Sequence, residues 1–363
     1  MKNLTLKLLQ PFGMYVRINL LLLVVVAIFF SSCNSGILID NPYESVDWEN
    51  HLQYKANFHT HTTRSDGRLN PDTVVDIYHA LGYHILAITD HNEVTYPWTG
   101  FSEMDASERS YSRKENDPET MPANFNFQDR NPVVLKMIDI EGNEFSRHHH
   151  MGSFFNSLMG TTDVTESLEA IAEQDGIVML NHPGRYNYPV EWYTDLFHKH
   201  DHLIGLEVYN QADRYPQDRP KWDSLLTVTM PDRNIWAYSN DDMHTLPHLG
   251  RNWNMMILQE LTHESVREGM EKGLSYFIYA PQGHNGPTPP VIHSIKTNNR
   301  KGTIEINASG YIAVEWISEG KVVHDGPAIN LKDLEQTGSY VRAMFYGEGE
   351  TVAGTQPFGL KKH

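Results

Sequence analysis

The chain has 363 residues, enough for one large α/β domain and a small second domain, and its 46 acidic residues exceed its 29 basic ones. The formal net charge of −17 at pH 7 repels long polyanions, which argues against a general nucleic-acid-binding protein, so no nucleic acid is expected as a partner. The single cysteine, Cys33, excludes an intramolecular disulfide and a cysteine-based zinc site.

The N-terminus has the layout of an export signal. Basic residues precede an uncharged apolar run at 20–30, which is followed by Ser-Ser-Cys. The run has 11 residues, well short of the roughly 20 that span a bilayer, so we expect a signal peptide over 1–32 rather than a transmembrane helix. The small residues before Cys33 resemble a bacterial lipobox, which predicts lipidation of Cys33, a polar tether over 34–50, and an exported, lipid-anchored protein of the bacterial cell envelope. An ordinary secretory signal with an incidental cysteine is the alternative.

From residue 54 to about 281, strand-like and helical segments alternate along the chain. Most of the strand-like runs are continuously apolar, which is typical of strands buried on both faces. Asn70-Pro71 and Gly82 supply the start and stop signals of one intervening helix. Alternation over this length predicts a single (β/α) barrel. The expected strands are 55–59, 84–89, 133–140, 177–181, 203–209, 235–239, 255–258 and 276–279.

Histidines and carboxylates gather just after these strands, which is where a (β/α) barrel builds its site. His59 and His61 stand two positions apart on a strand, so both side chains leave the same face and can hold one ion. Imidazole and carboxylate are the usual ligands of borderline and harder divalent metals, so the clusters predict one polynuclear metal site with hydrolytic chemistry. The cluster residues are His59, His61, Asp66, Asp90, His91, Glu144, His148, His149, His150, His182, Asp242 and His244.

Two further regions have a different character. Residues 92–132 form a long connection rich in proline, asparagine and charge, for which a folded insertion near the site and a surface loop are both open interpretations. After the proline-rich stretch at 286–290, short alternating strands predict a small all-β, sandwich-like domain at 287–363. This second domain carries no cluster of catalytic type. Its expected strands are 304–306, 311–317, 321–324 and 339–346.

Five motifs in order give the body of the chain a resemblance to a known family. Residues 57–66 read Asn-Phe-His-Thr-His-Thr-Thr-Arg-Ser-Asp, and 87–92 read Ala-Ile-Thr-Asp-His-Asn. They are followed by Gly-Asn-Glu at 142–144, Leu-Asn-His-Pro-Gly-Arg at 180–185 and Asp-Met-His at 242–244. Together these motifs resemble those of the polymerase and histidinol phosphatase (PHP) superfamily. The resemblance implies a distorted (β/α)7 barrel over 51–283, a di- or trinuclear metal centre and phosphoester hydrolysis.

The resemblance also implies a role for each cluster residue. A first metal is expected on His59, His61, Glu144 and Asp242. Glu144 would bridge to a second metal that His182 and one histidine of the triplet complete, with His149 and His150 both open. Asp241 and Glu141 compete with Asp242 and Glu144, and the motif spacing favours the latter two. The third metal is expected on Asp66, His91 and His244.

Other polar residues near the motifs are candidates for catalysis or substrate binding. Arg185 ends the fourth motif, three positions after His182, and is the best candidate to bind a phosphate in bidentate fashion. Arg64 is the second candidate. Glu207, near the end of a buried strand, is expected at the same mouth, in contact with substrate or behind a metal ligand. Asp90 is a candidate catalytic carboxylate, or else it orients a neighbouring imidazole.

The sequence therefore predicts a metal-dependent phosphoesterase that acts on small phosphate esters with two or three divalent ions. Zinc, manganese and iron all suit such ligands, so the metal is not named. The expected partners are a small phosphorylated substrate and a membrane, the latter through the lipid anchor. An amidohydrolase-like C–N or ester hydrolase is one alternative, and a non-catalytic surface-binding lipoprotein is another. The substrate, and whether it is a mono- or diester, cannot be read from the residues.

Overall fold

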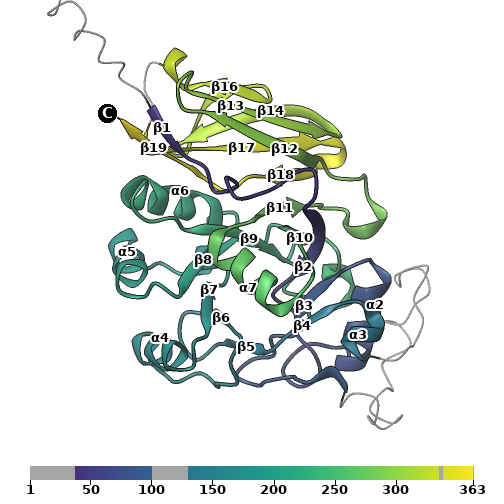
Figure 1. Ribbon diagram of the computed structural model, residues 1–363. Coiled ribbons are helices and arrows are strands. Elements are labelled where there is room, and N and C mark those ends of the chain that lie inside the picture. Colours follow the sequence, from purple (N-terminus) through teal and green to yellow (C-terminus); the bar gives the residue numbers. More distant parts are fainter. Residues whose placement is uncertain (1–36, 100–129, 335–337, 363) are drawn as a thin grey trace, which may run out of the picture.

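The structure is a computed structural model that describes residues 37–99, 130–334 and 338–362 (Figure 1). The expected signal peptide, Cys33 and most of the connection at 92–132 lie outside these residues. An α/β body carries the helices, and a β module covers one side of it, at the top of Figure 1. Within the described ranges, no helix combines the length and apolar character that a membrane crossing requires.

The strands of the body form two separate sheets. In the first, β4, β3 and β2 are parallel, and β2 continues through antiparallel pairing to β10 and β11. In the second, an antiparallel β5–β6–β7 unit continues into parallel β7, β8 and β9. The first sheet uses β2 (Leu52–Asn57), β3 (Ile85–Ala87), β4 (Ile138–Ile140), β10 (Asn252–Leu258) and β11 (Ser275–Tyr279). The second uses β5 (Gly142–Phe145), β6 (Met151–Phe154), β7 (Ile177–Leu180), β8 (Leu203–Asn210) and β9 (Trp236–Asn240).

Amide side chains connect the two sheets at a position where a closed barrel would have main-chain hydrogen bonds between neighbouring strands. The main-chain N–H of Phe58 donates to Asn240 Oδ1 at 3.0 Å, and that of Ser239 donates to Asn254 Oδ1 at 3.0 Å. Because side-chain oxygens take these main-chain donors, strand pairing stops at β9 and β10. The α/β class is confirmed, but the predicted closed barrel is not present as one hydrogen-bonded sheet. Isolated bridges join Thr60 to Met243 and His91 to Glu144.

The helices follow their sequence signals, with one correction. The predicted strand at 133–140 begins instead as the helical turn α3, because Asn131 Oδ1 accepts from Val133 N–H, Pro132 stands at the first position, and Lys136 ends the turn at φ 53°. Within the predicted strand at 133–140, only β4 (Ile138–Ile140) is extended. The helices are α2 (Pro71–Ala80), α3 (Pro132–Leu135), α4 (Val164–Glu173), α5 (Val190–Lys199), α6 (Asp218–Thr229) and α7 (His263–Lys272).

The β module is hydrogen-bonded to the body and to the start of the described chain. β17 pairs with β18, and β18 pairs with β11 of the body. β1 lies within the expected tether at 34–50, yet it pairs antiparallel with β19, so this part of the segment belongs to the folded module. The module comprises β1 (Ile37–Asp40), β12 (Val291–Asn298), β13 (Thr303–Ser309), β14 (Tyr311–Ser318), β15 (Lys321–Asp325), β16 (Ala328–Asn330), β17 (Tyr340–Gly347), β18 (Val352–Gly354) and β19 (Phe358–Lys362).

Tyr43 joins the segment after β1 to both parts of the molecule. Its fully buried hydroxyl donates to the Ser275 carbonyl at 2.9 Å and accepts from the Gln356 N–H at 2.8 Å. The Gln356 side chain bonds to the main chain of Ala237, as a neighbouring strand would. Its Oε1 accepts from the Ala237 N–H at 2.8 Å, and its Nε2 donates to the Ala237 carbonyl at 2.9 Å. One phenol therefore satisfies main-chain groups of β11 and of the β module.

We expect Tyr43→Phe to lower the free energy of unfolding by about 1–3 kcal/mol, because it leaves buried main-chain groups without partners. Urea denaturation measures the change. Tyr54→Phe is the matched control, since within the described chain the structure gives the Tyr54 hydroxyl no hydrogen bond, and it should shift stability by less than about 0.5 kcal/mol. Equal effects of the two substitutions would contradict this role of Tyr43.

Candidate metal centre

Glu144, in β5, lies at the centre of the histidine cluster and is fully buried. Its two carboxylate oxygens face different imidazoles, so the carboxylate separates two groups of nitrogen atoms. Glu141, the alternative carboxylate, belongs to none of the ligand groups found in the described residues. Glu144 Oε1 lies 3.1 Å from His150 Nδ1 and 3.3 Å from both His59 Nε2 and His182 Nε2, and Oε2 lies 2.8 Å from His91 Nδ1 and 3.6 Å from His61 Nε2.

Asp242 is the carboxylate of the last motif that joins the cluster. Its Oδ1 lies 3.3 Å from His59 Nε2 and 3.1 Å from His61 Nε2. Its neighbour Asp241 turns the other way and accepts hydrogen bonds of 2.8, 2.8 and 2.9 Å from three successive main-chain N–H groups and one of 3.0 Å from the Tyr78 hydroxyl. The positive φ of Asp242, 43°, accompanies this reversal. Asp241 therefore anchors the loop after β9, whereas Asp242 faces the cluster.

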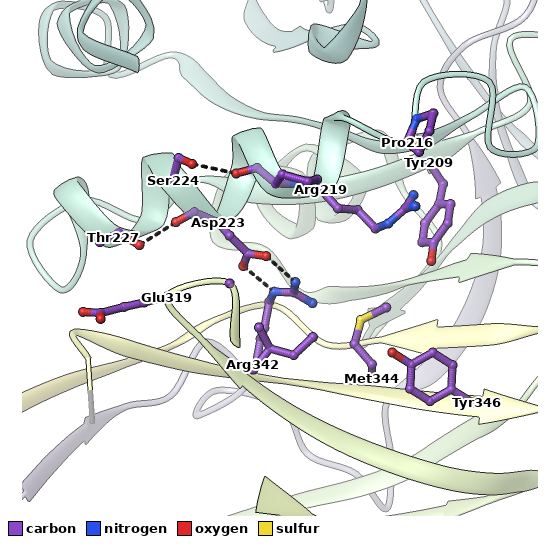
Figure 2. A pocket seen from close by; sticks show the side chains of 13 residues that line it. Tyr209, Pro216, Arg219, Asp223, Ser224, Thr227, Glu319, Arg342, Met344 and Tyr346 are labelled. Carbon is purple, nitrogen blue, oxygen red and sulfur yellow. Dashed lines mark hydrogen bonds and ion pairs between the residues drawn. The ribbon is translucent and has the colours of Figure 1, made fainter. Parts of the chain in front are cut away.

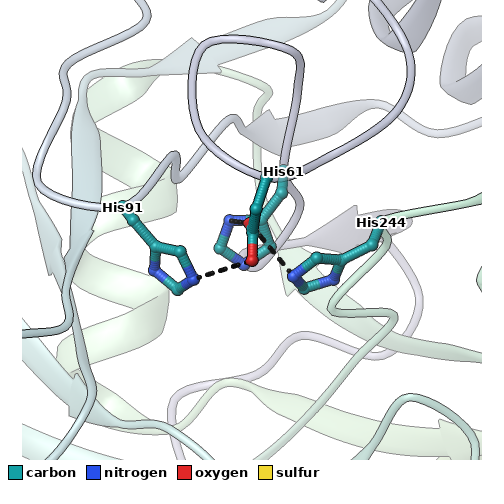
Figure 3. A group of neighbouring side chains, drawn as sticks. His61, His91 and His244 are labelled. Atoms are coloured by element: carbon teal, nitrogen blue, oxygen red, sulfur yellow. Dashed lines mark ion pairs between the residues drawn. The ribbon is translucent and has the colours of Figure 1, made fainter.

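A more open group lies at the edge of the cluster, around Asp66 (Figure 3). Asp66 Oδ1 lies 3.2 Å from His244 Nε2 and 3.8 Å from His61 Nδ1, and Oδ2 lies 3.5 Å from His91 Nε2. His61 thus faces Asp66 with one ring nitrogen and Asp242 with the other. Because a neutral imidazole has one free lone pair, His61 can serve only one of these groups at a time.

The histidine triplet contributes His150 to the cluster, and His149 lies elsewhere. The His149 ring has its Nε2 3.1 Å from the Tyr193 hydroxyl and its Nδ1 2.9 Å from the His150 carbonyl, and it stacks on Tyr186 at 4.1 Å. His149 is fully buried among aromatic rings, and burial lowers its pKa well below the usual value. Of the two open candidates, His150 therefore faces Glu144, and His149 does not.

Glu207 was expected either in contact with substrate or behind a metal ligand, and the structure places it behind His59. It is fully buried in β8, and Oε1 accepts from His59 Nδ1 and Asn240 Nδ2, both at 2.9 Å. Oε2 accepts from the His182 N–H and Asn210 Nδ2, both at 2.8 Å. Both oxygens are occupied by protein donors, so Glu207 fixes the His59 ring with Nε2 toward the cluster.

Asp90 was expected as a catalytic carboxylate, but it holds a loop. It accepts hydrogen bonds from Thr62 N–H at 2.7 Å, Thr62 Oγ1 at 2.6 Å, Ser65 Oγ at 2.7 Å and Thr95 Oγ1 at 2.6 Å. Four donors leave this buried carboxylate little capacity for a metal or substrate. Ser65 Oγ also lies 3.5 Å from His61 Nδ1, so Asp90 shapes the segment that carries His61 and Asp66.

Both candidate arginines are exposed. Arg185 ends the short turn η2 (Pro183–Arg185) directly after His182, with its guanidinium 5.7 Å from the centre of the Tyr186 ring. Arg64 lies between His61 and Asp66, and its N–H donates to Thr62 Oγ1 at 3.1 Å. Their contact with a substrate remains a prediction.

Sequence reasoning missed several residues that hold the ligands in place. Asn181 Nδ2 donates to Glu144 Oε1 at 2.8 Å, and its Oδ1 accepts from the Gly152 N–H. His248 Nδ1 accepts from the His244 N–H at 3.3 Å and lies 3.1 Å from Gln211 Nε2. Asn181 was visible beside His182 in the fourth motif. The distant Gln211 had no signal in the sequence.

The electrostatics of the cluster keep its carboxylates ionised. Burial acts to raise the pKa of Glu144 and of Asp242, but neighbouring imidazoles, His59 first among them, hold both pKa values below normal. Hydrogen bonds from His244 and His91 lower the pKa of Asp66. Burial opposes protonation of His91, yet Asp66 and Glu144 raise its pKa to about 10. These interactions favour ionised carboxylates and a protonated His91.

The unpaired polar atoms of the cluster fit divalent cations. Glu144 Oε2, Asp242 Oδ1 and His91 Nδ1 are buried and have no partner in hydrogen-bond geometry. Buried groups in this condition are costly, and cations bound by these atoms would satisfy them. Nitrogen and oxygen donors without sulfur suit zinc, manganese or iron. The ligand groups are His59, His61 and Glu144; His61, Asp66, His91 and His244; His91, Glu144 and His150; and His59, His182 and Glu207.

No family model and no curated protein match the sequence. Among solved structures, a two-domain protein containing a predicted PHP-like metal-dependent phosphoesterase from Bacteroides vulgatus is 14% identical, with a TM-score of 0.48 over 88% of this chain and 96% of that one. A Pyrococcus furiosus lesion-specific endonuclease is 15% identical, with a TM-score of 0.39 over 61% and 56% of the two chains. An amidohydrolase from Chromobacterium violaceum is 16% identical, with a TM-score of 0.34 over 52% and 87%. With TM-scores below 0.5, these likenesses carry no argument about function.

We expect His150→Gln to weaken the binding of one metal ion by more than about tenfold, because it removes a nitrogen 3.1 Å from Glu144. His149→Gln is the matched control and should keep the metal content while lowering stability. Elemental analysis of the two purified variants gives the comparison. Loss of metal from the His149 variant alone would reverse the assignment.

Metal binding should release protons at pH 7, because the pKa of His91, raised to about 10, keeps its imidazole protonated in the metal-free protein. Coordination needs the neutral ring, so the apparent affinity should rise as the pH increases from 7 toward 10. Titration calorimetry in buffers of different ionisation enthalpy measures the released protons. A binding enthalpy that is the same in every buffer would rule this out.

Proposed function

We propose that the chain is a metal-dependent hydrolase that cleaves phosphate esters of small molecules with two or three divalent cations. The observation that carries the proposal is the fully buried Glu144 carboxylate, each of whose oxygens faces a different set of imidazoles. An anion in this position reduces the repulsion between two cations a few ångströms apart.

The candidate metal ligands fall into a buried group and a more exposed group. His59, His61 and Glu144 have side chains at most 1% exposed, whereas those of His91 and His244 are 23% and 21% exposed and that of Asp66 is 56% exposed. We therefore assign the deep positions to His59, His61, Asp242, His150 and His182 around Glu144, and an outer position to Asp66, His91 and His244. The substrate would approach from the side of Asp66.

Bound divalent cations would supply a hydroxide near neutral pH and stabilise negative charge on phosphoryl oxygens. The protein's own part is to position the ligands. Glu207 holds the His59 ring through Nδ1, and the Asp242 carbonyl, 2.9 Å from His244 Nδ1, leaves His244 Nε2 toward Asp66. Arg185, beside His182, is our candidate to bind a phosphate group from the open side.

The choice of a phosphate ester rests on the motif order, which resembles that of the PHP superfamily. We also interpret the two sheets as a distorted seven-stranded barrel whose closure passes through Asn240 and Asn254 side chains. The remaining proposals come from the sequence: export by residues 1–32, lipidation of Cys33, and residence in the bacterial cell envelope. A small phosphorylated molecule and a membrane are the proposed partners.

Glu144→Gln should reduce the phosphatase rate at least about a thousandfold, because a neutral amide cannot offset the charge of two cations. The control is Glu141→Gln, which lies in the same segment but outside every ligand group among the described residues. Steady-state rates and metal content, measured on both variants, give the test. Full activity of the Glu144 variant would remove the bridging carboxylate from the mechanism.

A substrate panel separates the proposed reaction from its alternatives. It should contain phosphomonoesters, phosphodiesters, amides and carboxylic esters, each with zinc, manganese or iron added. Turnover of phosphate esters is expected, with a higher KM in Arg185→Ala. Turnover of amides alone would favour an amidohydrolase, and a metal-loaded protein inactive on the whole panel would favour a binding protein.

A further inference from the structure

A cavity of about 430 Å³ lies between the body and the β module (Figure 2). β8 and α6 form one wall, and β14 and β17 form the other. The cavity contains none of the metal-cluster residues. Its size falls within the range of about 300–1,000 Å³ that is usual for small-molecule sites.

Arg342, in β17, gives the cavity a buried donor without a partner. The residue is 2% exposed, and its Nε and Nη2 donate to the two carboxylate oxygens of Asp223 at 2.9 and 2.7 Å. The Tyr340 hydroxyl donates a further hydrogen bond of 2.8 Å to the Asp223 carboxylate. The guanidinium carbon of Arg342 lies 4.8 Å from the centre of the Trp222 ring. Arg342 Nη1, however, is buried with no hydrogen-bond partner. Arg342 lines the cavity, so a ligand oxygen that displaces the atoms packed over Nη1 would satisfy this donor.

The charges around the cavity decide which kind of oxygen fits. Arg219 is already bound by both carboxylate oxygens of Asp213, at 2.7 and 2.8 Å, and lies 4.2 Å from the centre of the Tyr209 ring. Each guanidinium therefore has its own carboxylate, and Glu319 adds a further negative charge to the lining. Like charge and the absence of an unpaired cation both disfavour an anionic ligand. A neutral oxygen is the fitting acceptor.

Other side chains of the lining are apolar or aromatic and can pack against the C–H groups of a ligand. Figure 2 shows Tyr209, Met344 and Tyr346 on one side of Arg342, with Glu319 on the other. A register shift in β8 between Glu207 and Tyr209 breaks the strand alternation, so Glu207 serves the metal cluster while Tyr209 faces this cavity. The Tyr346 hydroxyl donates to Glu315 at 2.8 Å, which fixes the ring.

We propose that this cavity binds a neutral sugar, as a mono- or disaccharide, independently of the metal centre. Sugars combine hydroxyl oxygens, which can accept from Arg342 Nη1, with C–H faces that pack against Tyr346 and Met344. Their lack of charge suits a site whose two arginines are already paired.

The test measures binding of glucose, galactose, mannose, N-acetylglucosamine, maltose and lactose to the protein by saturation-transfer NMR and calorimetry. At least one sugar should bind saturably. Arg342→Lys, which keeps a cation opposite Asp223 but removes Nη1, should weaken that binding about tenfold or more. Tyr346→Ala should do the same through loss of the ring face, and it decides the question if the Arg342 variant does not fold. Thermal melts check both variants.

Two controls locate the site. Arg233→Lys alters a different cavity, of about 340 Å³, where the Arg233 Nε is also buried without a partner, and it should leave sugar binding unchanged. Glu144→Gln should also leave it unchanged, which separates this site from the proposed hydrolase. The proposal is overturned if none of the sugars binds, if inorganic phosphate or citrate binds in their place, or if the Arg342 and Tyr346 variants bind like the parent.

Discussion

The site depends on one constraint, which is that a fully buried carboxylate, Glu144, must be neutralised by the groups around it. An isolated carboxylate in this position would be protonated or excluded, because transferring it from water costs several kcal/mol. Five imidazoles lie within 3.6 Å of its oxygens, and His59, His150 and His182 among them hold its pKa well below normal. The strands that supply those imidazoles are consequently tied to one centre, and the two sheets meet around it.

Residues behind the ligands determine which nitrogen of each ring is presented. Glu207 occupies His59 Nδ1, and the Asp242 carbonyl lies 2.9 Å from His244 Nδ1. Asn181 occupies one lone pair of Glu144 itself. Such contacts keep rings and carboxylates oriented when no cation is bound, so the site does not need to reorganise to accept one.

Much of the site could be predicted from the sequence because it follows local rules. His59 and His61 follow β2 rather than lie on it, but their i and i+2 spacing still brings their Nε2 atoms within 3.0 Å of each other. The Asp-x-His spacing separated Asp242 from Asp241. For Asp90 and Glu207 the sequence left a direct role and a supporting role open. It could not choose between them, because the choice depends on donors such as Thr95 and Asn240 that are brought close only by folding. Likewise, β1 and β19 are too far apart in the sequence for a local pattern to predict their pairing. At 133–140 the β-branched residues favoured a strand, but the helix-starting signal at Asn131 and Pro132 gave a helical turn instead.

The pairing of β1 with β19 also constrains the order of folding. Tyr43 bonds to Gln356 across 313 positions of sequence, so the first described strand, β1, has no β19 partner until almost the whole chain has been synthesised. Until then β1 is an open edge, able to pair with other chains. The strands of the body from β2 to β9 precede β12 in the chain and can associate earlier. The pairing of β1 with β19 therefore comes late in the assembly of the described chain.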